Sequence, residues 1–137
     1  ASSLVGSEMC IRDRSYGNDM LISDNPFECG FEKLVHLNDN VEFIGKDSLK
    51  KILKNGIKRK LMGVKINSDT LNLTSVDLFN KEKQIIGNLR SAAFSPTFKK
   101  IVGIAMINKE YCKNNEIFNI NSNDNLIDGE VCELPII

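Results

Sequence analysis

Short segments rich in apolar and β-branched residues, about six in number, occupy the chain from residue 58 to its end, and polar turn residues separate them. The expected strands are residues 60–66, 76–79, 84–86 continued by 89–94, 101–107, 116–120 and 131–134. Polar residues 80–83 are expected to form a hairpin turn, and residues 121–128 a polar loop. The nearly continuous apolar run 101–107 is typical of a strand buried on both faces. Strands this short must pair with one another, so the pattern predicts a mainly β (α+β) chain built on a small antiparallel barrel or sandwich.

One clear helix precedes these strands, at residues 46–55. Leu49, Ile52 and Leu53 are spaced i, i+3 and i+4, which gives the helix one apolar face. Gly56 follows it, at the position where a left-handed C-terminal cap is favoured. The lysines at positions 50, 51 and 54 lie on the other face. We expect these lysines to be solvated, with phosphate binding as the less favoured alternative.

Charge and cysteine usage exclude several classes of function. Lys and Arg number 18, as do Asp and Glu, so no net field attracts nucleic acid or a membrane surface. The apolar runs are far shorter than the ~20 residues of a membrane helix. The four cysteines show no C-x-x-C spacing and His36 is the only histidine, so no metal site is expected. Scattered cysteines indicate reduced thiols and a cytoplasmic protein.

The first 45 residues contain less regular structure than the rest. Residues 1–14 have no helical or strand period and do not match the remainder of the chain, so we expect an artefactual or disordered extension without chemistry. An ordinary flexible terminus is the alternative. Residues 15–19 and 24–26 form turn-forming clusters. Residues 31–37 are partly apolar and are expected to form a short strand.

Five short motifs occur in an order that resembles the glycine-cleavage aminomethyltransferase family, over residues 15–137. That family commonly has Tyr-Gly-x-Asp, then Pro-x-Glu-x-Gly, and ends with Val-x-x-Leu-Pro. The matching elements here are Tyr16-Gly17-Asn18-Asp19, Pro26-Phe27-Glu28-Cys29-Gly30, Phe43-Ile44-Gly45-Lys46, Ser91-Ala92-Ala93-Phe94-Ser95-Pro96-Thr97-Phe98 and Val131-Cys132-Glu133-Leu134-Pro135.

Within the family the chain resembles dimethylsulfoniopropionate demethylases more than the glycine-cleavage enzyme. Arg90-Ser91-Ala92-Ala93 stands where glycine-cleavage members usually have Thr-Ser-Gly-Thr, and residues 68–74 lack their Pro-Arg-x-Gly. Three alternatives remain. The chain could belong to a glycine-cleavage aminomethyltransferase or serve as a packing module without activity. It could also belong to a folate-binding iron–sulfur assembly factor, although the Lys-Gly-Cys-Tyr-x-Gly-Gln-Glu motif of those factors is not found in this sequence.

The resemblance implies a tetrahydrofolate-dependent one-carbon transferase with two folate-binding lobes and a C-terminal antiparallel β-barrel. Residues 15–45 would then be the end of a folate-binding lobe, and residues 46–137 the barrel domain with its preceding helix. The substrate would be a small sulfonium or aminomethyl donor. In the glycine-cleavage enzyme the acidic residue near the reacting carbon lies in the N-terminal lobe. No catalytic residue is therefore expected in this chain, and the chain alone is expected to be inactive.

Two residues are the candidate cofactor contacts. The resemblance places Tyr16 near the folate channel, where its ring could stack on the cofactor and its hydroxyl could form a hydrogen bond. The alternative for Tyr16 is a turn tyrosine that covers the junction between lobe and barrel. Arg90 is the basic residue best suited to a folate tail or substrate carboxylate, because arginine forms forked contacts with carboxylates. The alternative for Arg90 is a surface ion pair.

Other polar residues in the motifs are expected to have structural roles. The side chains of Asn18 and Asp19 should bond to their own turn. Glu28 should anchor a backbone segment or pair with a basic group. Ser95 should fix a strand end, because a nucleophilic serine needs an adjacent base and His36 lies in a different segment.

Overall fold

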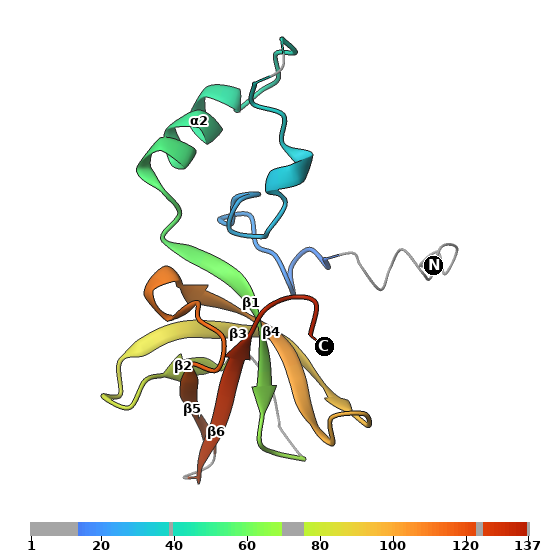
Figure 1. The fold of residues 1–137 in the computed structure, drawn as a ribbon, viewed down its shortest axis with the longest axis vertical. Helices are drawn as coiled ribbons and strands as arrows, with labels where there is room; N and C mark the ends of the chain where they lie inside the picture. The colour runs from blue at the N-terminus through green and yellow to red at the C-terminus, as the bar shows by residue number, and fades with distance from the viewer. Residues whose placement is uncertain (1–13, 39, 70–75, 123–124, 137) are drawn as a thin grey trace.

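The computed structural model describes residues 14–38, 40–69, 76–122 and 125–136 (Figure 1). Its helical elements are η1 (Glu32–Leu34), α2 (Lys46–Asn55) and η2 (Lys109–Tyr111). Its strands are β1 (Arg59–Ile66), β2 (Asp77–Phe79), β3 (Ile85–Ser95), β4 (Lys100–Asn108), β5 (Ile117–Ser122) and β6 (Asn125–Cys132). Apart from Arg14, the predicted extension 1–14 lies outside the described residues, so the prediction that it is disordered stays a prediction.

The strands form a closed antiparallel barrel in the order β1-β4-β3-β2-β5-β6. The barrel closes where β6 returns to β1, with Val64 opposite Val131 and Gly63 opposite Cys132. This confirms the mainly β prediction and selects the barrel over the sandwich. Closure gives each described strand two hydrogen-bonded neighbours, so that none of these six strands is an edge strand along its whole length. None of the described helices is long and apolar enough to cross a membrane.

The barrel interior is filled by one or two large apolar side chains from each strand. The largest fully buried side chains are Val64 and Ile66 on β1, Leu78 on β2, Ile86 on β3, Ile107 on β4, Phe118 and Ile120 on β5, and Val131 on β6. The prediction of a strand buried on both faces is confirmed for the second half of β4, where three consecutive residues are buried, at positions 105–107. Gly129 is buried against the ring of Phe118, and a Cβ there would lie 2.3 Å from the ring Cζ.

Strand β3 was predicted as two pieces, 84–86 and 89–94, but it is one continuous strand with two β-bulges. Opposite β2, Gly87 pairs with Leu78 and Ile85 pairs with Phe79, so Ile86 is the extra residue. Opposite β4, the pairing passes from Leu89 to Ser91 and leaves Arg90 as the extra residue. Each bulge inserts one residue and changes which side chains face inward.

The predicted loop at 121–128 is wrong, because β5 and β6 form a long hairpin through most of that range. Asn119 pairs with Asp128, and Asn121 pairs with Leu126. Asn121 and Asp128, one on each strand of this hairpin, are exposed, whereas Phe118 and Ile120 on β5 are buried. The predicted turn at 80–83 is confirmed, since the backbone N–H of Asn80 donates to the carbonyl of Gln84 at 3.0 Å.

Residues 14–58, which we call the arm, precede the barrel. In the arm, helix α2 has the predicted bounds, and its three lysines at positions 50, 51 and 54 are exposed as predicted. The C-terminal cap Gly56 has a positive φ of 77° but an extended ψ of 153°, so its conformation is not the predicted left-handed helical one. The strand predicted at 31–37 is wrong, because a single 3-10 turn, η1, forms there instead.

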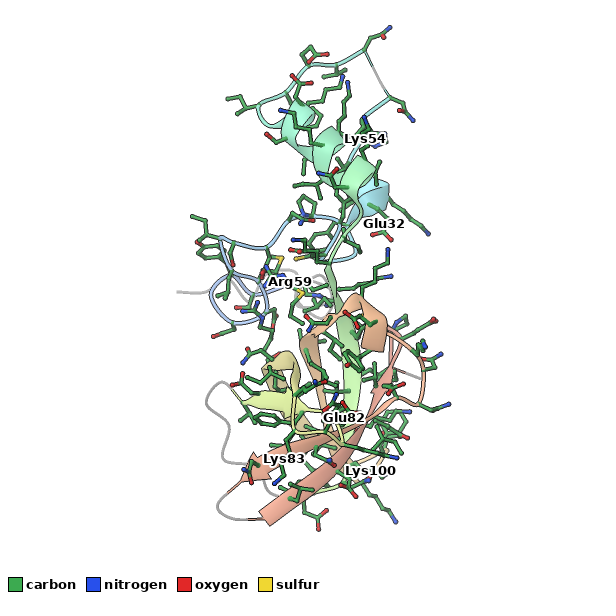
Figure 2. The ribbon with its side chains drawn as sticks, turned by 90° about the vertical axis from the view of Figure 1, so that its left-hand side faces the viewer. Glu32, Lys54, Arg59, Glu82, Lys83 and Lys100 are labelled. Carbon is green, nitrogen blue, oxygen red and sulfur yellow. The ribbon has the colours of Figure 1, made fainter. Side chains whose placement is uncertain are left out.

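Helix α2 stands away from the barrel, and the chain leads from it directly into β1 (Figure 1). Arg59, the first residue of β1, lies at the level where the arm meets the barrel (Figure 2). The domain division proposed between residues 45 and 46 stays a prediction.

Candidate functional site

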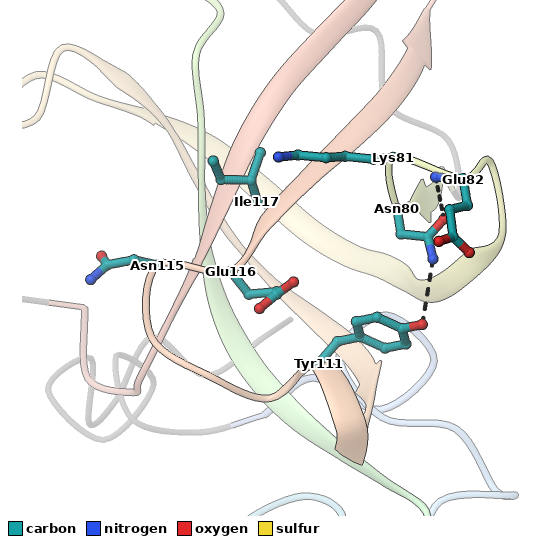
Figure 3. A pocket seen from close by; sticks show the side chains of 7 residues that line it. All are labelled: Asn80, Lys81, Glu82, Tyr111, Asn115, Glu116 and Ile117. Carbon is teal, nitrogen blue, oxygen red and sulfur yellow. Dashed lines mark hydrogen bonds between the residues drawn. The ribbon is translucent and has the colours of Figure 1, made fainter.

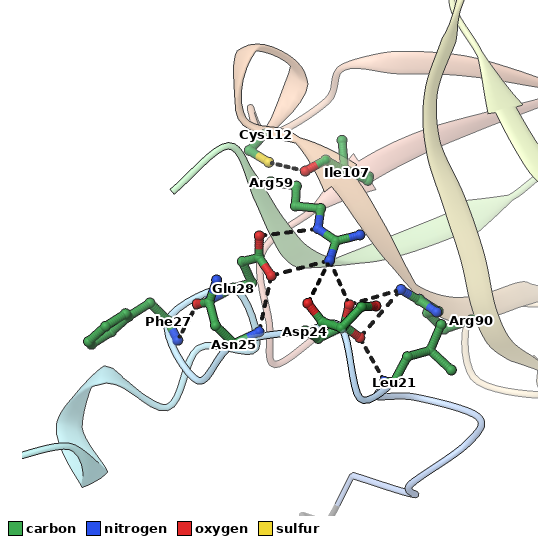
Figure 4. Close-up of polar contacts among 10 residues, drawn as sticks. Leu21, Asp24, Asn25, Phe27, Glu28, Arg59, Arg90, Ile107 and Cys112 are labelled. Carbon is green, nitrogen blue, oxygen red and sulfur yellow. Dashed lines mark hydrogen bonds and ion pairs between the residues drawn. The ribbon is translucent and has the colours of Figure 1, made fainter. Parts of the chain in front are cut away.

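A network of charged side chains, buried except at the partly exposed Arg59, joins the arm to the barrel (Figure 4). At its centre is Asp24, whose side chain is 1% exposed. Asp24 Oδ1 lies 2.9 Å from Arg59 Nη2 on β1 and 3.3 Å from Arg90 Nη2 on β3. Arg59 also donates from Nε to Glu28 Oε1 at 3.1 Å. Two carboxylates of the arm thus neutralise two arginines of the barrel, which is the arrangement that buried charges require.

A tight turn at residues 25–30 positions Glu28. The side chain of Asn25 accepts hydrogen bonds from the backbone N–H groups of Phe27 and Glu28, at 3.1 and 3.0 Å. Glu28 Oε2 accepts from the N–H of Asn25 at 3.1 Å, which completes a reciprocal arrangement like a helix capping box. The carbonyl of Glu28 accepts from the N–H of Leu61 on β1 at 2.7 Å. The predicted structural role of Glu28 is therefore confirmed.

A second contact between arm and barrel lies beside the network. The hydroxyl of Ser91 on β3 donates to Asp19 Oδ1 at 2.7 Å, and Asp19 Oδ2 accepts from the backbone N–H of Ser15 at 2.7 Å. Asp19 therefore bonds to its own turn, as predicted, and to the barrel as well.

The two candidate cofactor contacts have very different surroundings. Tyr16 lies in the turn that carries Asp19, and it is 72% exposed. Arg90 is the buried partner of Asp24, with a side chain only 8% exposed, so its ion pair is not at the surface as the alternative expectation has it. Among the described residues its Nε has no hydrogen-bond partner. The neighbouring residues Arg90 and Ser91 thus contact the same part of the arm. A cofactor role for Tyr16 or for Arg90 stays a prediction.

Charge and burial in the network act on the thiol of Cys29, which is buried next to Glu28. Its pKa is raised above the ordinary value of 9.0, first by burial and then by the carboxylates of Asp24 and Glu28, while Arg90 and Arg14 oppose the rise. The pKa of Arg59 is also raised, mainly because its side chain donates to Glu28. Cys29 is therefore a neutral thiol at neutral pH, beside an arginine, Arg59, whose charged form the same carboxylates favour.

We expect Cys29, Cys112 and Cys132 to be alkylated more slowly by iodoacetamide at pH 8 in the folded chain than in urea. All three are free thiols whose pKa is raised chiefly by burial, so the reactive thiolate is scarcer in the folded state. The stability that these thiols contribute is present below their ordinary pKa of 9.0 and decreases as pH rises through their raised folded pKa values. Mass spectrometry of the separate peptides measures each rate. Equal alkylation rates in the folded chain and in urea would show that folding does not protect these thiols.

Two further residues from the sequence analysis, Ser95 and His36, lie outside this network. Ser95 Oγ accepts from the backbone N–H of Phe98 at 3.4 Å, which confirms its role in fixing a strand end. His36 is exposed in the arm. Among the described residues, no three His, Cys, Asp or Glu side chains gather as metal ligands would.

A shallow groove of about 420 Å³ lies elsewhere on the barrel, between the β2–β3 turn and the start of β5 (Figure 3). Asn80 Nδ2 donates to the hydroxyl of Tyr111 across it at 3.4 Å. Its charged side chains are those of Lys81, Glu82 and Glu116. Since both signs of charge are present and the groove is open, it favours no particular ligand.

Comparisons with known proteins agree with the barrel. A family model described as the glycine cleavage T-protein C-terminal barrel domain matches residues 59–137. An aminomethyltransferase of Thermosipho melanesiensis is 33% identical over 135 residues, which cover 96% of this chain and 36% of that protein. One of Thermoanaerobacter pseudethanolicus is 36% identical over 98 residues, which cover 72% of this chain and 26% of that protein. The chain thus spans about a third or less of the length of these relatives.

A solved structure supports the fold independently. The glycine cleavage system aminomethyltransferase T from Bartonella henselae superposes on 92% of this chain with a TM-score of 0.83. It is 21% identical to this chain, which covers 36% of the solved protein. At that identity the match shows a shared fold, including most of the arm as well as the barrel.

Proposed function

Because this chain belongs to the glycine cleavage T-protein family, we propose that it is the C-terminal region of a tetrahydrofolate-dependent one-carbon transferase. The observation that carries the proposal is the alignment of 96% of the chain, arm included, with an aminomethyltransferase. The substrate of the whole protein would be a small one-carbon donor, and a cytoplasmic location is part of the same proposal.

The exposed ring of Tyr16 fits a role as a cofactor contact. It is held on a hydrogen-bonded turn, and 72% of the residue is open to a partner. Bound tetrahydrofolate would supply the nitrogen that accepts the one-carbon unit. Tyr16 would stack against one of the cofactor rings and orient it, and positioning of this kind supplies much of the catalysis in such transfers.

Arg90 could contact a ligand through only one of its nitrogen atoms, Nε. Its Nη2 is engaged by Asp24, whereas its Nε is buried and has no partner among the described residues. A buried donor without an acceptor costs about 1–3 kcal/mol, which a ligand carboxylate placed beside Nε would remove. We therefore retain Arg90 as the second proposed contact, through this one atom.

A sulfonium methyl donor is the second candidate for the substrate, as in the demethylases that the chain resembles. The supporting observation is Arg90 itself, which stands where glycine-cleavage members usually have threonine and forms the buried pair with Asp24. The named relatives instead favour an aminomethyl donor. Turnover assays with each donor and tetrahydrofolate, on a full-length protein that ends in these residues, decide between them. Turnover of neither donor would contradict the proposed function, whereas turnover by the isolated chain would contradict its expected inactivity.

We expect Tyr16→Phe to weaken folate binding modestly and Tyr16→Ala to weaken it more in such a full-length protein. Loss of the hydroxyl removes at most one hydrogen bond, worth about 0.5–1.5 kcal/mol. Loss of the ring removes a stacking face worth roughly another 0.5–1.5 kcal/mol. Folate titrations measure the two dissociation constants, and thermal melts test for a merely structural effect. Tyr111→Phe, which alters the only other tyrosine, is the matched control. An unchanged affinity in the alanine variant would remove Tyr16 from the site.

A further inference from the structure

The β-bulge at Arg90 directs two consecutive side chains of β3 toward the arm. In a regular strand, residues three apart point to opposite faces. Leu89 lies in the core, however, and Ala92 packs against the same core. The extra residue at the bulge accounts for this spacing. Arg90 and Ser91, which lie between these two core contacts, are therefore both free to face outward.

Both side chains hold the arm, at points five residues apart. Ser91 Oγ donates to Asp19 Oδ1 at 2.7 Å. Arg90 Nη2 donates to the two oxygens of Asp24 at 3.3 and 3.4 Å. The bulge thus brings two tethers side by side, where a regular strand would direct one of them to the opposite face.

The first tether reaches a turn that is closed by its own hydrogen bonds. The carbonyl of Ser15 accepts from the backbone N–H groups of Asp19 and Met20, at 2.8 and 3.2 Å. The N–H of Gly17 donates to the carbonyl of Met20 at 2.8 Å, and Gly17 has the positive φ of 90° that this closure requires. The turn therefore behaves as one unit, and Asp19 connects it to the barrel.

We propose that Ser91, supported by the neighbouring Arg90–Asp24 pair, is a positioning residue that fixes the turn carrying Tyr16 against the barrel. The inference rests on the proposed function only for the ligand that Tyr16 would contact. In physical terms, the hydroxyl of Ser91 restricts the motion of this turn relative to β3. Binding residues must be held within about 0.5 Å of their working geometry, and one short hydrogen bond to a carboxylate can provide such a constraint.

Backbone ¹⁵N relaxation of the full chain tests this directly, without any folate. We expect order parameters near 0.85 for the amides of residues 15–20 in the natural sequence, and below about 0.6 in Ser91→Ala, with the amides of β4 unchanged. Ser91→Thr keeps a hydroxyl on a strand-compatible side chain and should restore the rigid values. Ser95→Ala removes the other serine hydroxyl of β3, which bonds only locally, and should leave the turn rigid.

Three outcomes would overturn the inference. They are a turn that is already mobile in the natural sequence, a turn that stays rigid in Ser91→Ala, and an equal loss of order in β4, which would indicate general damage to the barrel. None of them depends on a ligand. A failure here is therefore separate from a failure of the folate titrations, which test the proposed function.

Discussion

Replacing Asp24 with alanine is expected to destabilise the contact between arm and barrel by about 3–5 kcal/mol, the usual cost of breaking a buried ion pair by removing one partner. Asp24 is 1% exposed and lies between two arginines. Arg59 would keep Glu28 as a partner. Arg90, 8% exposed, has no other ion-pair partner among the described residues. Either Arg90 remains buried without its carboxylate, or the arm leaves the barrel and admits water.

Urea unfolding followed by circular dichroism, together with amide exchange at Leu61, measures this loss. The N–H of Leu61 donates to the carbonyl of Glu28, so its exchange reports when the arm leaves β1. Asp77→Ala is the matched control, because Asp77 is an exposed aspartate that accepts a hydrogen bond from Asn88 at the surface, and its loss should cost about 0.5 kcal/mol or less. A loss below about 1 kcal/mol in Asp24→Ala would mean that the buried network does not hold the arm.

The parts of the fold that depend on local pattern were predictable. Helix α2 has the predicted bounds because its apolar spacing and its flanking glycines act within a few residues. The turn at 80–83 is likewise local, since Asn80 satisfies it with its own side chain and backbone. The closed barrel agrees with strands too short to be stable except as a mutually paired set.

Features set by pairing between distant strands were not predictable in the same way. The bulge at Arg90 exists only relative to β4, and nothing in the residues beside it indicates an extra residue. Residues 121–128 contain many asparagines and aspartates, which favour turns, yet pairing of β5 with β6 overrides that preference. In the arm, residues 31–37 have no partner strand among the described residues, so a locally bonded turn forms instead.

In the candidate site, too, local motifs were predictable from the sequence, whereas contacts between distant residues were not. Family motifs indicated Tyr16, Glu28, Arg90 and Ser91 by position, but Asp24 and Arg59 were not recognised as partners. Asp24 was predicted only as part of a turn, because its arginines lie 35 and 66 residues away along the chain. An aspartate in a turn is commonplace, and only the fold shows that this one is buried between two guanidinium groups. The contact of Asp19 with Ser91, 72 residues away, is hidden for the same reason.

Phe118→Ala should cost about 3–5 kcal/mol of unfolding free energy, the usual range for removing a buried phenylalanine ring from a core. Phe118 is 0% exposed, and it pairs directly with Gly129 across the β5–β6 hairpin. The opposite position has room for no side chain, because a Cβ on Gly129 would lie 2.3 and 2.6 Å from two ring carbons. The large residue and the glycine are therefore one packing unit, and the barrel cannot collapse fully into the space that the ring leaves.

This pairing predicts a measurable non-additivity between the two positions. Gly129→Ala should be strongly destabilising in the natural sequence, since backbone on one side and the ring on the other leave the new methyl group no room. In the Phe118→Ala background the two ring carbons nearest the new Cβ are absent, whereas the carbonyl of Lys65, 3.0 Å from that Cβ, still opposes it. Gly129→Ala should therefore cost less in the Phe118→Ala background than in the natural sequence, by roughly 1–3 kcal/mol in a double-mutant cycle measured by urea unfolding.

Phe94→Ala, at a residue that is 51% exposed, is the control and should cost far less than Phe118→Ala. Strictly additive costs at positions 118 and 129 would mean that the barrel relaxes around the ring, and that the glycine is required for backbone reasons alone.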